Sequence, residues 1–401
     1  MLPGALLLLV LAADPLPSPF RDLPPDQNAW PLLLQAVGLL KKDTAPKTDY
    51  PSWRDPIRPE IRKHLAANEA ALAKLAEALA RPDLAKSPAE AQSYQAKGLG
   101  PACQGVRELA RLKAQRAYTR AADGDRLGAL ADLDDVLTLA DRLDAGPGCL
   151  IDWLVTRATV AIALDAARRL LGPPPAGFDP AKADPTVAWP LSAYPDAERR
   201  AWLGLTAHLG HERPAVAGLR LALAGDLIFA RSVLTNPARA AEIGLKSLPS
   251  EEVLATYLER LATAFAALAE AAAQPAWRRG PLPSAEGGTG DAMDAFYKES
   301  IESLVRLPGR LDRERALRRL TASVIGLRLY GGAHGRLPAD LDALEVDGVL
   351  GGVALDPFDG QPLRWAPRRG LLYSVGEEGR DLGPDGAKVL TAPAFFVTPP
   401  R

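Results

Sequence analysis

Few side chains in this sequence could act as nucleophiles, and the two cysteines are the most reactive of them. The chain contains neither the Gly-x-Ser-x-Gly turn of serine hydrolases nor a Ser-x-x-Lys pair. A catalytic cysteine needs a basic neighbour, normally a histidine, and no histidine stands near Cys103 or Cys149 in the sequence. The sequence therefore carries no local pattern typical of nucleophilic catalysis.

The two cysteines are expected to lie at the same end of a helical hairpin. Cys103 begins one predicted helix, the next helix returns, and Cys149 begins the third. Two helices of about 20 residues, each about 30 Å long, bring the chain back to its starting end, so the two sulfurs could be close. A disulfide between them would close a loop of about 45 residues. The alternative is two separate buried thiols, since cysteine is common in protein cores.

His208 and His211, followed by Glu212, form a pattern that could bind a metal ion. On a helix this spacing places both rings on one face, but it is not the spacing of zinc proteases and no third ligand is apparent. The alternative is a polar helix end before Pro214, where a histidine interacts favourably with the helix dipole. The glycine-rich segment 287–290 follows a loop rather than a strand, which indicates a linker and not a phosphate-binding turn.

The composition is that of a globular protein without strong net charge. The 401 residues include 48 Lys and Arg and 49 Asp and Glu, which disfavours nucleic-acid binding because that function uses a basic surface. Two cysteines are too few for a disulfide-rich scaffold or a four-cysteine metal site. Arginines are frequent on one predicted helix, and we expect them to face solvent or a partner: they are Arg313, Arg315, Arg318, Arg319 and Arg328.

The first residues are typical of an export signal. An apolar run from Ala5 to Ala13 is too short to cross a bilayer and ends in small residues suited to cleavage after Ala12 or Ala13. No lysine or arginine precedes Arg21, so the alternative is a buried N-terminal helix. We expect residues 1–13 to be a signal peptide and the mature chain to be periplasmic or extracellular, without a transmembrane anchor.

Hydrophobic periodicity predicts a mainly α-helical fold. Apolar residues recur at helical spacing, and short turns such as Asp123-Gly124-Asp125 make successive helices antiparallel. We therefore predict an antiparallel helical bundle or an array of helical hairpins, followed by a small C-terminal α+β module with a short antiparallel sheet. The predicted divisions are an N-terminal helical region over 14–171, a linker over 172–195, a second helical region over 196–310, the module over 311–390 and a tail over 391–401.

The strand pattern is concentrated in the module. Leu363–Trp365 and Leu371–Val375 are predicted as a hairpin, and in the second strand Leu371, Tyr373 and Val375 alternate as the residues of a half-buried strand do. Almost all of the strand signal in the chain lies in this C-terminal part.

The C-terminal segment carries an ordered set of short motifs. A helix ending at Leu329-Tyr330 is followed by Gly335-Arg336-Leu337-Pro338, then by Asp356-Pro357-Phe358-Asp359-Gly360-Gln361-Pro362, and then by Leu372-Tyr373-Ser374-Val375-Gly376. In this order the segment resembles the globular part of the G-type (major) pseudopilins of type II secretion. Members of that family begin with a cleaved apolar helix, whereas the matching helix here is internal and arginine-rich, so we expect no polymerisation. The whole chain is also similar to exported bacterial helical proteins that carry this ending.

The pseudopilin resemblance implies a calcium site after the last matched strand. In G-type pseudopilins this loop binds calcium through carboxylates and backbone carbonyls. The corresponding loop here is 376–386, and Asp381 and Asp385 are its candidate ligands. Arg380 places a positive charge in the same loop. The alternative is a solvated turn whose acidic residues accept backbone N–H groups.

These observations favour a structural or binding role in the cell envelope, with a protein partner and without catalytic activity of its own. Two alternatives remain. The chain could be a hydrolase-type enzyme whose carboxylates are dispersed through loops, or an accessory component of a type II secretion or pilus-like system, the latter by analogy alone. A deep pocket with convergent carboxyl groups of shifted pKa would favour the enzyme.

Overall fold

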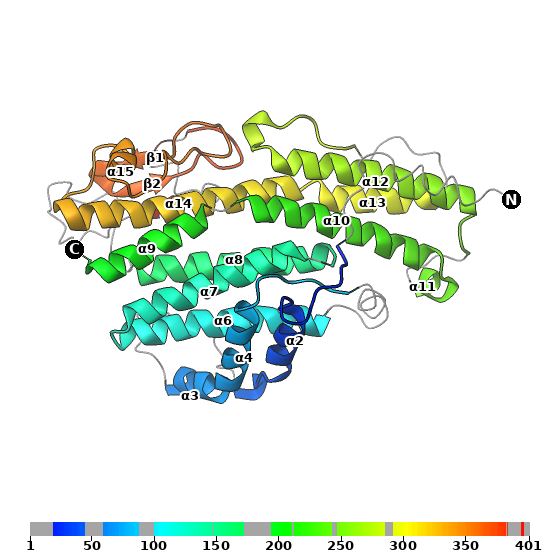
Figure 1. The fold of residues 1–401 in the computed structure, drawn as a ribbon. Coiled ribbons are helices and arrows are strands. Elements are labelled where there is room, and N and C mark those ends of the chain that lie inside the picture. The colour runs from blue at the N-terminus through cyan, green and yellow to red at the C-terminus, as the bar shows by residue number, and fades with distance from the viewer. Residues whose placement is uncertain are drawn as a thin grey trace.

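Helices make up most of the molecule (Figure 1). The computed structural model describes residues 19–44, 59–87, 100–146, 148–171, 194–210, 212–242, 247–284, 292–381, 383 and 394–396. The helices are α2 (Trp30–Gly38), α3 (Pro59–Ala67), α4 (Glu69–Leu79), α6 (Gly100–Ala122), α7 (Arg126–Ala145), α8 (Leu150–Leu170), α9 (Asp196–Leu209), α10 (Arg213–Leu234), α11 (Pro237–Glu242), α12 (Glu251–Ala273), α13 (Ala292–Leu304), α14 (Leu307–His334) and α15 (Asp342–Val346). The strands are β1 (Arg364–Ala366), β2 (Leu371–Tyr373) and β3 (Ala394–Phe396). The predicted mainly α-helical class with a small antiparallel sheet is confirmed.

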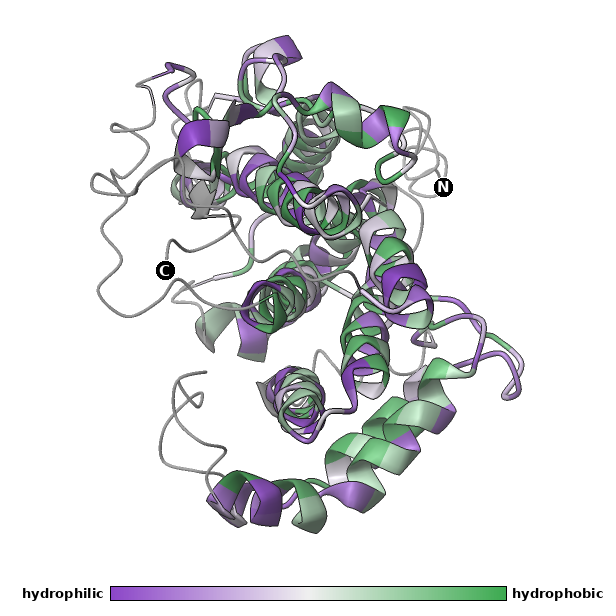
Figure 2. Cartoon of the chain, turned by 90° about the vertical axis from the view of Figure 1, so that its left-hand side faces the viewer, coloured by the Kyte–Doolittle hydropathy of each residue, from purple (hydrophilic) through white to green (hydrophobic). Residues whose placement is uncertain are grey.

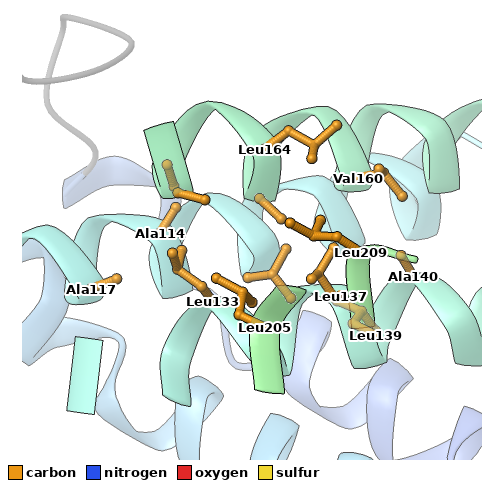
Figure 3. Close-up of a cluster of buried hydrophobic side chains, with 14 of the residues drawn as sticks. Ala114, Ala117, Leu133, Leu137, Leu139, Ala140, Val160, Leu164, Leu205 and Leu209 are labelled. Carbon is orange, nitrogen blue, oxygen red and sulfur yellow. The ribbon is translucent and has the colours of Figure 1, made fainter. Parts of the chain in front are cut away.

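Helices α6, α7 and α8 form the predicted antiparallel hairpins. Gly124 adopts a left-handed φ of 89°, and the Asp125 side chain accepts the N–H of Gly128, so the turn caps the start of α7. Leucines and alanines from these helices interlock with leucines of α9 (Figure 3). Figure 2 shows that most helices carry both hydrophobic and hydrophilic residues, as helices that pack on one side do.

The helical segment that follows Pro59 is broken at Asn68, between α3 and α4. Asn68 is fully buried, its Oδ1 accepts the N–H of Lys41 at 2.8 Å, and its Nδ2 donates to the carbonyl of His64 at 2.9 Å. This side chain thus bonds to the backbone of α3 and to that of Lys41, which follows α2, and such side chain–backbone bonds compete with a continuous helix.

Helix α14 connects the predicted divisions of the chain. It begins at Leu307 and ends at His334, beyond the predicted end at Leu329-Tyr330, and Gly335 closes it in the left-handed region with a φ of 67°. One continuous core includes side chains of α2, α7 and α14 together with Leu372 of the sheet. A second core lies between α10, α12 and α13. The N-terminal region and the C-terminal module therefore share a core.

The sheet has the order β1-β2-β3, with both pairs antiparallel. Strand β3 comes from the range predicted as a tail. The predicted alternation in β2 is wrong, because Leu371, Leu372 and Tyr373 are all buried. Leu372 belongs to the main core while Leu371 and Tyr373 pack together on the other side, so both faces of the strand are covered. Among the helices that the structure describes, none is both long and apolar enough to span a bilayer.

Candidate functional site

Both cysteines of the chain lie against one buried carboxylate, that of Asp152 in the first turn of α8. The Sγ atom of Cys103 is 3.4 Å from Asp152 Oδ1, and that of Cys149 is 3.9 Å from Oδ2. Lys86 forms an ion pair with Asp152 Oδ2. All four residues are buried, and we call them the dithiol site. Both cysteines are free thiols in this structure, so the disulfide between them stays a prediction.

Lys86 reaches this site from an extended segment, residues 81–87, which we call the strap. Asn28 holds the strap by donating to the carbonyl of Ala85 at 2.9 Å and accepting its N–H at 3.1 Å. Arg21 pairs with Asp83 at 2.6 Å. The Lys86 ammonium lies 4.5 Å from the centre of the Trp30 ring, a cation–π contact. The strap therefore supplies the positive charge of the dithiol site.

Three glycines allow the backbone to crowd around the site. A Cβ on Gly146 would collide with the carbonyl oxygen of Leu84 in the strap. One on Gly225 of α10 would collide with the carbonyl oxygen of Gly148. The N–H of Gly148 donates to Asp152 Oδ2 at 2.7 Å, so Asp152 is held both by Lys86 and by the turn between α7 and α8. The turn between α7 and α8 is thus packed closely against both the strap and α10.

The surroundings keep both thiols protonated. Burial, assisted by the negative charge of Asp152, raises the pKa of the Cys103 thiol to about 12. The same two causes raise the pKa of the Cys149 thiol, while Lys86 lowers both. A thiol with so high a pKa is a poor nucleophile at neutral pH. This arrangement does not suit a catalytic cysteine.

Asp226 of α10 lies beside the dithiol site, and its Oδ1 accepts the N–H of Leu150 at 3.1 Å. Burial raises the pKa of Asp226 to about 6, with a further contribution from the charge of Asp152. Because the folded pKa lies above the ordinary value of 3.8, the folded protein binds this proton more tightly than the unfolded chain does. The resulting stabilisation is complete below about pH 3.8 and is lost as the pH rises through about 6.

We expect the substitution Asp226→Asn to increase the free energy of unfolding at pH 7.5 by about 1–2 kcal/mol, and by less at pH 4.5. The amide can still accept the N–H of Leu150 but carries no charge to bury. Urea unfolding at the two pH values measures the difference. Asp123→Asn is the control, and we expect it to lower the free energy of unfolding rather than raise it. The reason is that Arg62 holds the pKa of the exposed Asp123 carboxyl below its usual value. An equal effect of Asp226→Asn at both pH values would contradict the assignment.

A second buried group of charges joins α7, α8 and α14. Asp144 pairs with Arg157, whose Nη1 is also 2.8 Å from Glu314 Oε1. Arg318 Nε lies 2.9 Å from the same oxygen. The expectation that the arginines of α14 face solvent or a partner is wrong for Arg315 and Arg318, which are buried. Asp312 and Glu314, one turn earlier on the same helix, balance the charges of Arg315 and Arg318.

His208 serves as a tie between helices. Its Nδ1 is 2.8 Å from Asp134 Oδ1 and its Nε2 is 3.1 Å from Asp141 Oδ2, so it links α9 to α7. Burial lowers its pKa, but the two aspartates outweigh that effect and raise it to about 9. His208 is therefore charged at neutral pH and unsuited to bind a metal ion. The other half of the predicted pair, His211, lies outside the described residues.

The candidate calcium ligand Asp381 is already engaged by groups of the protein. Its Oδ1 accepts the hydroxyl of Tyr373 at 3.1 Å and the N–H of Gly383 at 2.8 Å, and its Oδ2 is 3.4 Å from Nε of Arg364. Arg364 also pairs with Asp359. The carboxylate of Asp381 thus already has a cationic partner and two hydrogen-bond donors. The second candidate, Asp385, lies outside the described residues.

We expect millimolar calcium to leave the thermal unfolding midpoint of the protein unchanged, because Arg364 already balances the charge of Asp381. A ligand that binds only the folded state must raise this midpoint. The measurement compares calcium with an equal concentration of magnesium and with a chelator. A rise specific to calcium that Asp381→Ala and Asp385→Ala together abolish would establish the calcium site instead.

Within the described parts of the chain, no group of three or more His, Cys, Asp or Glu side chains is arranged to hold a metal ion. Comparison with protein-family models, with curated proteins and with solved structures finds no match to this chain. Of the predicted site residues, the structure brings Cys103 and Cys149 together around Asp152. It places Asp381 beside Arg364.

Sequence reasoning missed Lys86, Asp152 and Asp226. Asp152 follows Cys149 by three residues on a predicted helix, a spacing that places the two on one face. That spacing could have predicted that the carboxylate of Asp152 lies near Cys149. Lys86 and Asp226 are far from both cysteines in sequence, and only the fold brings them to the site.

Proposed function

We propose that this chain is an exported cell-envelope protein with a structural or binding role and a protein partner, and without catalytic activity. One observation supports the proposal that the chain has no catalytic activity. In the described residues, buried carboxylates pair with cations from other elements and thereby tie those elements together. The pairs are Asp132 with Lys113, Asp144 with Arg157, Asp152 with Lys86, and Asp312 with Arg279. A carboxylate held in this way fixes the fold and is poorly placed to transfer protons to a substrate.

Export is supported by the apolar run from Ala5 to Ala13, which lies outside the described residues. We expect mass spectrometry of the native mature protein to find its first residue at Ala13 or Asp14, in the envelope or extracellular fraction. Recovery of the intact chain from Met1 in the cytosolic fraction would refute export. Cross-linking in the native envelope, followed by identification of the attached proteins, would show whether a partner belongs to a secretion machine.

The rival class is an enzyme with dispersed carboxylates, and one observation favours it. Burial raises the pKa of Asp144 and of Asp226 to about 6, a value suited to proton transfer. The test expresses Asp144→Asn and Asp226→Asn in a deletion strain of the native host and measures resistance of the envelope to detergent. A structural role predicts that both variants, once shown to fold, restore the wild-type phenotype. Loss of function by a folded Asp→Asn variant would favour the enzyme.

A further inference from the structure

The dithiol site has the components of a redox centre. Cys103 and Cys149 are the two cysteines of the whole chain, so any disulfide within one molecule must join them. Their sulfurs lie 3.4 Å and 3.9 Å from the two oxygens of Asp152, and both residues are buried. Cys103 lies in the first turn of α6 and Cys149 immediately precedes α8, so a bond between them would join the starts of two helices.

We propose that a compound carrying a disulfide, either a small molecule or a protein, oxidises the dithiol site to an intramolecular disulfide between Cys103 and Cys149. The proposal rests on the proposed function only in one respect, namely that export would place the chain where disulfides persist. The chemistry itself requires only the two thiols and the exchange partner.

The exchange proceeds in two balanced steps. First, one cysteine loses its proton and attacks a sulfur of the partner disulfide, which forms a mixed disulfide and releases one partner thiolate. Second, the other cysteine loses its proton and attacks the protein sulfur of the mixed disulfide, which forms the Cys103–Cys149 bond and releases the second partner thiolate. The two protons end on the two released thiolates. Two protein thiols and one disulfide thus become one protein disulfide and two thiols.

Two features of the structure set the rate of this exchange. Both sulfurs are buried, and the strap supplies the Lys86 that pairs with Asp152 beside them, so we expect movement of residues 81–87 to expose the sulfurs; Asn28 holds the strap through two hydrogen bonds to Ala85. Burial, together with the charge of Asp152, keeps the thiols protonated and so slows their attack, while Lys86 opposes this effect. Asn28 and Asp152 are therefore positioning residues for a reaction that occurs on the sulfurs.

The experiment incubates the reduced full-length protein with oxidised glutathione, then blocks the remaining thiols in denaturant and measures the intact mass. The wild type is expected to lose both thiols together, to retain no glutathione, and to unfold at a higher temperature than its reduced form. The variants Cys103→Ser and Cys149→Ser are expected to retain one glutathione and to gain no stability. Asn28→Ala is expected to speed the reaction several-fold. Asp152→Asn is expected to shift the pH profile of the rate to lower pH, which a merely structural role would not do.

The proposal is overturned if the wild type and Asn28→Ala both keep two free thiols under conditions in which the urea-unfolded chain is oxidised. Glutathione retained on both cysteines of the wild type would overturn it as well. Neither outcome depends on export, since the purified protein is used. A native protein found intact in the cytosol would therefore contradict the proposed function while leaving the redox site in place.

Discussion

Replacing Lys86 with methionine is expected to lower the free energy of unfolding by about 3–5 kcal/mol. Lys86 is 1% exposed and provides the cation that pairs with Asp152. Methionine fills much of the space of the lysine stem but leaves the carboxylate buried with the N–H of Gly148 and without its counter-charge. An uncompensated buried charge costs more than the pair contributes when intact. Urea unfolding at pH 7.5, followed by far-ultraviolet circular dichroism, measures this loss.

Lys74→Met is the matched control, because Lys74 pairs with Glu77 on a solvent-exposed helix face. We expect this substitution to change the stability by less than about 0.5 kcal/mol. The double variant Lys86→Met/Asp152→Asn is expected to regain most of the loss, since the amide can accept the N–H of Gly148 without a charge. If Lys86→Met cost no more than Lys74→Met, the buried ion pair would not exist in solution.

Local patterns were sufficient to predict most of the helices. The turn at Asp123-Gly124-Asp125 behaves as its residue types require, with Gly124 in the left-handed region and Asp125 capping α7. Ser250 likewise caps α12 by accepting the N–H of Val253 at 3.3 Å. Signals of this kind involve neighbours in sequence, so a single chain reveals them. For the same reason the hairpin geometry was sufficient to place Cys103 and Cys149 at one end of the bundle.

The features that the sequence did not predict depend on partners far away in the chain. Arg318 looks like a surface residue, but Asp144 and Arg157 from two other helices gather at Glu314, its partner on α14. Lys86 is buried because Asp152, 66 positions along the chain, balances its charge. Strand β3 was missed because three residues are too few for a period-two pattern to stand out. Each of these features is a tertiary contact, for which local periodicity holds no information.

Replacing Gly225 with alanine is expected to destabilise the protein by about 3 kcal/mol, although alanine is the better helix former. Gly225 faces the turn between α7 and α8, where an added Cβ would collide with the carbonyl oxygen of Gly148 and come within 2.8 Å of its carbonyl carbon. Backbone atoms cannot move aside as a flexible side chain can. Relief would require α10 to shift away from the turn, which would disturb the hydrogen bond between Asp226 and Leu150.

Gly204→Ala is the control for this substitution, because Gly204 lies within α9 and an added Cβ there would meet no atom within 4 Å. In an exposed helix interior the same change should stabilise by about 1 kcal/mol. The two variants are thus expected to move the urea midpoint in opposite directions, although each adds one methyl group to a helical glycine. If Gly225→Ala stabilised the protein as Gly204→Ala does, α10 would not lie against the Gly148 turn. The strap and Asp226 would then not enclose the two thiols as described.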